Sequence, residues 1–204
     1  MVLANWTIVS GTATVNTDPA SGTPSTEPAL QIAGSGAGAT QRAFLTYNTA
    51  QQHTHGRITS YLRCQDASED ERWRLYFNYA DATHYYVVII FSSLTKDGEV
   101  ELWGADGGAE AQIGTDFGTL PAGQRLSAAW TSNYRATWWR AGGVLYVRFE
   151  YWNGTAWVQL GVDKTDATPL TPAVTDKFGV EFSNDGSAVA KWGKADKTIL
   201  EYKN

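Results

Sequence analysis

The chain has little of several features that would define its class. It carries one cysteine, Cys64, among 204 residues, which excludes an intramolecular disulfide framework and predicts a buried or half-buried free thiol. Its 16 basic residues are outnumbered by 21 acidic ones, and the net charge is −5. This balance argues against a nucleic-acid partner, because binding phosphates requires a basic face. It argues equally against binding to an anionic membrane surface.

Long apolar runs are also missing. The longest one, at 85–91, is the size of a strand, whereas a membrane-spanning helix needs about 20 apolar residues, so no membrane insertion is expected. The first residues do not combine a basic segment with an apolar one, so no secretory signal is visible. We expect an extracellular or virion-surface location. The protein would reach it after removal of a signal or by another route, such as particle assembly followed by cell lysis.

What the chain has instead is a series of short strand-like runs. Helical periodicity is almost absent, and clusters of Gly, Asn, Asp, Ser and Pro separate the runs. Asp97-Gly98 and Asn153-Gly154 predict tight hairpin turns. Irregular loops are predicted at 17–28 and 163–175, but composition does not change across either, so residues 1–204 are predicted to form a single β-sandwich domain. The predicted strands lie near 5–9, 12–15, 29–33, 42–47, 56–63, 72–79, 84–92, 99–103, 110–114, 125–131, 135–140, 144–151, 156–162, 178–182, 188–192 and 198–202.

The order of motifs in the C-terminal half resembles a known superfamily. A Leu-x-Val strand at 145–147 and a Trp-Val-x-Leu strand at 157–160 precede a Gly-Val strand at 179–180 and a terminal strand. This order is similar to that of the concanavalin A-like lectin/glucanase (laminin-G-like) jelly-roll superfamily, over about residues 40–202. With the strand count, the resemblance predicts an all-β, two-sheet antiparallel jelly-roll sandwich. It is a pattern of strands rather than a catalytic signature, so it bears on fold more than on activity.

The chain is rich in aromatic residues, with 9 Trp, 10 Tyr and 7 Phe, and several runs carry large side chains on both faces. In the run 72–79, odd positions hold Trp73, Leu75, Phe77 and Tyr79, which we predict to face the core. Further core stripes are predicted at 85/87/89/91, at 126/128/130 and at 145/147/149/151. The opposite faces would then line one concave sheet face with a ligand-binding set comprising Arg74, Tyr76, Asn78, Tyr86, Arg135, Trp139, Tyr146 and Arg148.

Such a face suits a carbohydrate or glycan surface, because aromatic rings stack on sugar rings while Arg and Asn bind hydroxyls or acidic groups. Two other interpretations stay open. The face could be ordinary surface, or it could be buried by a partner subunit or an overlying loop. Val88 and Ile90, which the same assignment puts on this face, favour burial.

Residues for catalysis or metal binding are scarce. Glu99 and Glu101 share one strand face, and laminarinase-like glucanases of the same superfamily carry three alternating acidic residues on a strand. Here the third position is Trp103, so we expect no catalytic residue, and we interpret the two glutamates as solvent-facing charges on an edge strand. The His53-Thr54-His55 segment has no third ligand nearby, so no metal site is predicted there. No cofactor is expected, although the acidic turns at 66–71 and 184–186 leave a structural Ca²⁺ open.

The sequence therefore predicts a non-catalytic, lectin-like carbohydrate-binding module. The alternative is a structural virus or phage particle protein, such as a capsid decoration, fibre or tail component, whose partners would be copies of itself or other particle proteins. A second alternative is a glycoside hydrolase or polysaccharide lyase. The missing third acidic residue and the absence of an obvious lyase motif disfavour that alternative.

Overall fold

A computed structural model describes residues 6–10, 12–16, 29–33, 41–47, 54–64, 70–93, 95–127, 133–173, 176–185 and 192–202. Nearly all of the regular structure in these ranges is β-strand, and none of their helices is long and apolar enough to cross a membrane. The strands are β1 Trp6–Ser10, β2 Thr12–Asn16, β3 Ala29–Ala33, β4 Gln41–Tyr47, β5 Gly56–Cys64, β6 Asp70–Asp81, β7 His84–Ser92, β8 Glu99–Asp106, β9 Ala111–Gln112, β10 Gly118–Thr119, β11 Asn133–Ala141, β12 Val144–Trp152, β13 Trp157–Gln159, β14 Lys164–Asp166, β15 Lys177–Asp185 and β16 Trp192–Tyr202.

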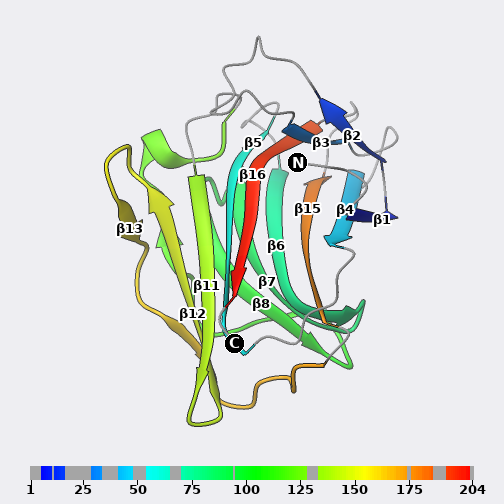
Figure 1. Cartoon of the computed structure of the whole chain (residues 1–204). Helices are drawn as coiled ribbons and strands as arrows, with labels where there is room; N and C mark the ends of the chain where they lie inside the picture. Colours follow the sequence, from blue (N-terminus) through cyan, green and yellow to red (C-terminus); the bar gives the residue numbers. More distant parts are fainter. Residues whose placement is uncertain are drawn as a thin grey trace.

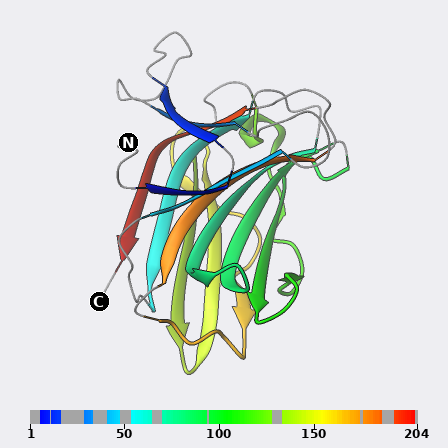
Figure 2. The ribbon, with the colours of Figure 1, turned by 90° about the vertical axis from the view of Figure 1, so that its right-hand side faces the viewer.

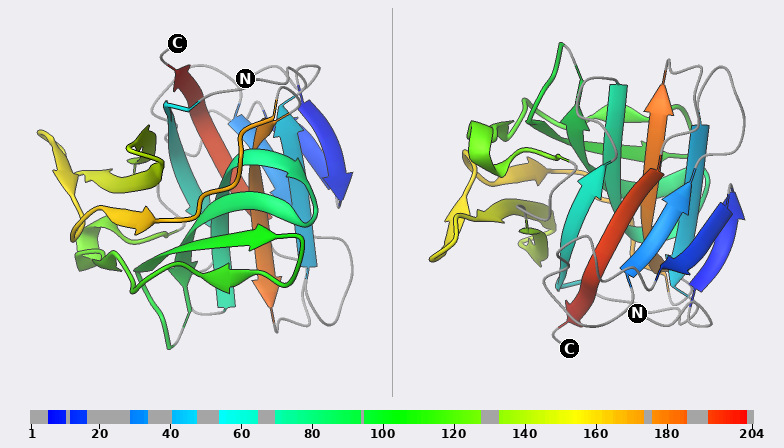
Figure 3. Two further views of the ribbon diagram at one scale, coloured as in Figure 1. Left: turned by 90° about the horizontal axis from the view of Figure 1, so that it is seen from below. Right: turned by 90° about the horizontal axis from the view of Figure 1, so that it is seen from above.

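The strands form two antiparallel sheets of eight strands each, stacked as the two layers seen in Figure 1 and, end-on, in Figure 3. Sheet A has the order β1-β4-β15-β6-β7-β8-β10, with β9 also paired to β8. Sheet B has the order β13-β12-β11-β5-β16-β3-β2, with β14 also paired to β12. The prediction of an all-β, two-sheet antiparallel jelly-roll sandwich is confirmed.

The main core fills the space between the two sheets. Trp73, Leu75 and Phe77 of β6 and Leu145, Val147 and Phe149 of β12 are all buried there, as predicted. The sheets approach so closely beside β16 that a Cβ on Gly193 would lie 2.5 Å from the Phe182 ring and 2.6 Å from the Trp73 ring. Glycine is therefore the residue that lets β16 pack at this position. Cys64 is a buried thiol in the same core, as predicted.

The predicted orientation of β7 is wrong. Tyr86, Val88 and Ile90 face the core between the sheets, whereas the odd positions predicted for the core lie on the outer face of sheet A. Both faces of β7 are apolar, so alternation alone does not identify the inward one.

The outer face of sheet A carries a second apolar cluster. It contains Tyr76, Tyr85, Val87, Ile89, Phe91 and Ala105, with Tyr79 and Trp103 packed against it. Val87 and Ile89 are 0% and 1% exposed although they point away from the main core. A bulge in β6, where Asn78 has φ of 48°, turns Tyr79 to this side, against the prediction that Tyr79 joins the main core. Figure 2 shows the curvature of β6, β7 and β8 that accompanies this arrangement.

A few strand boundaries differ from the prediction. The predicted strand near 125–131 is preceded by a short 3₁₀ turn, η3, at Ala122–Gln124, and residues 125–127 are not strand. Leu126 is nevertheless buried in the core, as predicted. Positions 128 and 130 of the same predicted core stripe lie outside the described residues. One long strand, β16, covers the end of the 188–192 run and all of 198–202. The short strands β10 and β14 were not predicted, because two or three residues carry no periodic signal.

Candidate functional site

The eight residues predicted to share one concave face are divided between the two sheets. Arg74 and Tyr76 lie on β6 of sheet A, whereas the other four outward-facing ones, Arg135, Trp139, Tyr146 and Arg148, lie on β11 and β12 of sheet B. The remaining two, Asn78 and Tyr86, are buried and do not lie on the outer face of either sheet. The placement on one face is therefore wrong, because periodicity along a strand does not tell which sheet the strand joins.

Tyr86 belongs to the core rather than to a binding surface. Its hydroxyl donates to Asp166 Oδ2 at 2.7 Å and accepts from the Leu170 backbone N–H at 2.8 Å. Burial and the neighbouring Asp166 raise the pKa of Tyr86 well above its usual value. Asn78 is also buried, 7% exposed, at the β6 bulge, where its side chain hydrogen-bonds to Asp176.

Arg74 and Tyr76 belong to a buried network on the outer face of sheet A. The Arg74 guanidinium binds the Glu110 carboxylate at 2.7 and 3.1 Å and lies 3.9 Å from Glu181. The Tyr76 hydroxyl donates to Glu181 Oε2 at 2.7 Å, and the Tyr85 hydroxyl donates to Glu110 Oε2 at 2.8 Å. Tyr76 is only 1% exposed, so its ring is not available for stacking on a ligand.

This network also sets the charge of Arg74. Burial alone would lower the pKa of Arg74, but Tyr76 and the carboxylates of Glu181 and Glu110 outweigh burial and raise it. The guanidinium is therefore held as a permanent cation between two carboxylates, which gives the network a structural role.

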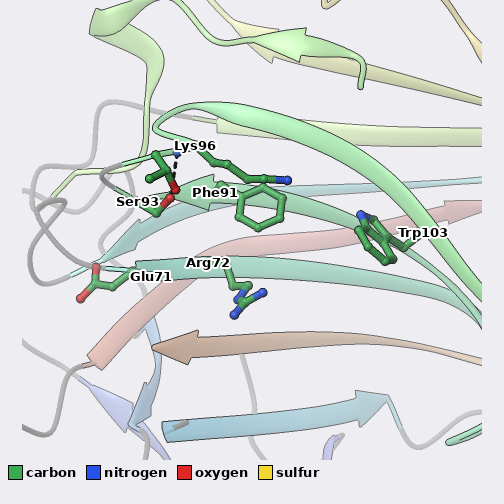
Figure 4. Close-up of a pocket in the computed structure, with 7 residues that line it drawn as sticks. Glu71, Arg72, Phe91, Ser93, Lys96 and Trp103 are labelled. Carbon is green, nitrogen blue, oxygen red and sulfur yellow. Dashed lines mark hydrogen bonds between the residues drawn. The ribbon is translucent and has the colours of Figure 1, made fainter. Parts of the chain in front are cut away.

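Next to this network, a groove of about 330 Å³ opens on the outer face of sheet A (Figure 4). Its walls come from β6, from β7, from the turn after β7 and from β8. The residues that line it are Glu71, Arg72, Phe91, Ser93, Thr95, Lys96 and Trp103. We call it the sheet A groove.

Aromatic rings and cations alternate along the sheet A groove. Figure 4 shows Phe91 between Lys96 and Arg72, with Trp103 farther along. The Lys96 ammonium lies 4.8 Å and the Arg72 guanidinium carbon 5.8 Å from the centre of the Phe91 ring, within the range of cation–π attraction. The groove thus combines apolar walls with hydrogen-bond donors, the composition typical of small-molecule sites.

A buried carboxylate beneath the surface fixes two of these walls. Glu101, 1% exposed, accepts hydrogen bonds from the Lys96 ammonium and, at 2.5 Å, from the Trp103 indole N–H. The hydrogen bond to Glu101 raises the pKa of Lys96. Lys96 and Trp103 are therefore held in position before any ligand arrives.

The interpretation of Glu99 and Glu101 as solvent-facing charges on an edge strand is wrong. The strand that carries them, β8, is paired on both sides, with β7 and with β9 and β10. Carboxylate oxygens of Glu99, Glu101 and Asp116 lie within 4.8 Å of one another. Burial, together with hydrogen bonds to the other two carboxyls, raises the pKa of Glu99 to about 7. Glu101 accepts hydrogen bonds from Lys96 and Trp103, and Glu99 hydrogen-bonds to Glu101 and Asp116. His53 and most of the acidic turns considered for calcium lie outside the described residues.

The outer face of sheet B carries the other four predicted residues. The Trp139 and Tyr146 rings are stacked with their centres 5.5 Å apart and their planes at 8°. Arg148 binds Asp163 through two hydrogen bonds of 2.8 Å, and its guanidinium carbon lies 5.5 Å from the centre of the Trp139 ring. Trp139 also lines a hollow of about 290 Å³, with Arg57, Thr137 and Glu201 among the other lining residues.

The groove residues themselves were not predicted as a site. Phe91 was assigned to the core because the prediction chose the wrong face of β7 as the inward one. Trp103 was noted only because it stands where the related glucanases carry a third acidic residue. Lys96 lies in a turn outside any periodic run. A signal was present in Glu99-Val100-Glu101-Leu102-Trp103, whose alternate positions combine acidic and aromatic residues on one face.

No family model matches the sequence, and no curated protein matches it. Solved structures do resemble it. The carbohydrate-binding module CBM66 from Bacillus subtilis has a TM-score of 0.56 and 16% identity, over 97% of this chain and 95% of that chain. The chain has the concanavalin A-like fold. A legume lectin-like domain from Entamoeba histolytica has a TM-score of 0.61 and 10% identity, over 99% of this chain and 92% of that one. A xylan β-1,4-xylosidase from Bacillus halodurans has a TM-score of 0.52 and 14% identity, over 86% of this chain and 33% of that chain.

Proposed function

We propose that this protein is a non-catalytic carbohydrate-binding module and that the sheet A groove is its saccharide site. The observation that carries the proposal is the groove itself, where Phe91 and Trp103 supply apolar walls and two cations project beside them. The concanavalin A-like fold supports the proposal, because a carbohydrate-binding module and a lectin-like domain share it.

The groove matches the two-sided chemistry of a sugar. The apolar face of a pyranose or furanose ring stacks on aromatic walls, and its hydroxyls need both donors and acceptors. Arg72 and Lys96 supply donors, while the hydroxyls of Ser93 and Thr95 can donate or accept. The volume of about 330 Å³ lies at the lower end of the ~300–1,000 Å³ typical of ligand sites. It suits a terminal ring or a short oligosaccharide.

The geometry of the carboxylates favours binding over hydrolysis. Glycoside hydrolases place two carboxyl groups on opposite sides of the scissile bond, about 5–9.5 Å apart. Glu99 and Glu101 instead hydrogen-bond to each other from the same strand. The described residues that line the groove do not include them. No carboxyl pair of this cluster could therefore flank a sugar bond in the groove.

The test is a glycan-array screen of the purified protein beside Trp103→Ala and Ile199→Ala. Ile199 is the control, because it is an exposed apolar side chain of β16 on the other sheet. We expect at least one glycan signal that Trp103→Ala loses and Ile199→Ala keeps, with both variants folded by circular dichroism. If Trp103→Ala loses no glycan signal, or if the wild type gives no signal at all, the groove is refuted as the site. Release of reducing sugar from the bound glycan would refute the non-catalytic assignment.

A further inference from the structure

The outer face of β12 carries a continuous row of side chains that the sheet A groove does not use. Tyr146, Arg148, Glu150 and Trp152 alternate along β12 and point away from the core, because Leu145, Val147 and Phe149 between them are buried in it. We call this row the β12 stripe. Figure 1 shows β11, β12 and β13, which form it and its borders, side by side at one margin of sheet B.

Each end of the β12 stripe is an aromatic pair. At one end, Tyr146 stacks on Trp139 of β11 with the ring centres 5.5 Å apart. At the other end, Trp152 meets Trp157 of β13 edge to face at 5.7 Å. All four rings are half-buried, so each keeps accessible surface. Single exposed aromatics are ordinary, but four in one row indicate a contact surface.

Between the aromatic pairs the β12 stripe is polar but has no net charge. Arg148 is paired with Asp163 through two hydrogen bonds of 2.8 Å. Arg135 is paired with Glu150 through bonds of 2.6 and 2.7 Å, and its guanidinium carbon lies 4.3 Å from the centre of the Trp157 ring. Two cations and two anions cancel. An ionic partner therefore gains little here, whereas hydroxyl groups can bind to the outer edges of both planar pairs.

The dimensions favour a narrow, extended ligand. Trp152 lies six positions after Tyr146 on β12, which corresponds to about 20 Å of strand at ~3.4 Å per residue. The stripe and its borders span two strand spacings, about 10 Å, so the surface is roughly 200 Å². A stable protein–protein interface buries about 800 Å² on each partner. The stripe is too small for such an interface but is long enough for several consecutive sugar rings.

We propose that the β12 stripe is a second binding site, separate from the sheet A groove, for an extended, uncharged polysaccharide chain. The chain would lie along β12 with sugar rings on the two aromatic pairs and hydroxyls on the Arg148–Asp163 and Arg135–Glu150 pairs. The two sites lie on opposite outer faces of the sandwich, so one molecule could hold a terminal sugar in the groove while its other face rests on a polymer.

The test uses linear, uncharged oligosaccharides of xylose and of glucose, from disaccharide to octasaccharide, together with the insoluble polymers xylan and cellulose. Binding is followed by tryptophan fluorescence and by co-sedimentation with the polymers. The background is Trp103→Ala, which removes a wall of the sheet A groove and leaves the stripe intact. This choice keeps a failure of the groove proposal distinct from a failure of this one.

We expect affinity to rise with chain length until the oligosaccharide reaches both aromatic pairs. Trp139→Ala and Trp152→Ala should each lower the affinity for the longest oligosaccharide roughly tenfold, which is ~1.4 kcal/mol, while leaving the affinity for the disaccharide nearly unchanged. Trp139→Tyr, which keeps a flat ring, should restore most of the affinity. Salt should have little effect, because the stripe has no net charge.

Three results would overturn the proposal. One is binding that does not depend on chain length or on either tryptophan. Another is no binding to any oligosaccharide or polymer in the set. The third is concentration-dependent self-association in sedimentation velocity that Trp139→Ala abolishes, because the stripe would then be an interface between copies of this chain.

Discussion

Replacing Arg74 with methionine tests whether the outer face of sheet A is a folded interior or an open surface. The substitution keeps a long apolar stem and removes only the cation. Arg74 has a side-chain exposure of 12% and faces Glu181 at 1% and Glu110 at 20%. Glu181 would keep its charge in a buried position with no guanidinium beside it.

The expected loss in the free energy of unfolding is large for a single substitution on the outer face of a sheet. Removing one partner of a buried ion pair costs roughly 3–5 kcal/mol, and partial exposure of Glu110 puts Arg74→Met at the lower end, about 3 kcal/mol. For a chain of 204 residues, 1 kcal/mol shifts the Tm by about 2–4 °C, so the Tm should fall by roughly 6–12 °C. Adding Glu181→Gln should recover about 1–2 kcal/mol, because glutamine still accepts the Tyr76 hydrogen bond but carries no charge.

Urea unfolding followed by tryptophan fluorescence measures these differences, with Arg148→Met as the matched control. Arg148 is also paired with a carboxylate but is 40% exposed, so its loss should cost less than about 1 kcal/mol. If Arg74→Met stays within about 0.5 kcal/mol of the wild type, the network is solvated and the reasoning fails.

Two further substitutions test other parts of the structure. Tyr86→Phe removes the hydroxyl that joins Asp166 and the Leu170 N–H to the core, and should cost about 2–3 kcal/mol in urea unfolding; an unchanged midpoint would contradict the position of Tyr86. Glu99→Gln tests the pKa of about 7, raised by burial and by Glu101 from the ordinary 4.5. A carboxyl whose folded-state pKa is raised loses stability as pH rises from 4.5 to 7. Glu99→Gln should therefore gain stability relative to the wild type across that window, and a constant difference would rule out the raised pKa.

The sequence was sufficient to predict the layers of this fold because many local signals agreed. Alternation in β6 and β12 identified Trp73, Leu75 and Phe77 on one strand and Leu145 and Val147 on another as core residues, and all five are buried. Asp97-Gly98 and Asn153-Gly154 do form turns with positive φ at glycine, 81° and 98°.

The site was harder to predict because several of its contacts join residues that are distant in sequence. Arg74 of β6 meets Glu110, and Arg72 of β6 lies against the Phe91 ring of β7. No period along a strand encodes such contacts. Which sheet a strand joins also depends on pairing with strands that are distant in sequence. Strand β5 pairs with β11 and β16 in sheet B, whereas the next strand, β6, pairs with β15 and β7 in sheet A.

The face of β7, in contrast, could have been derived from the sequence. In an antiparallel hairpin, directly opposite residues share a face. Asp81 pairs with His84 across a two-residue turn, so odd positions of β6 oppose even positions of β7. The bulge at Asn78 displaces the register by two places, which pairs Phe77 with Tyr86 instead of Val88 and keeps the parity. A core stripe on odd positions of β6 therefore requires a core stripe on even positions of β7. The outward position of Phe91, and with it the sheet A groove, follows from that pairing and not from hydrophobicity.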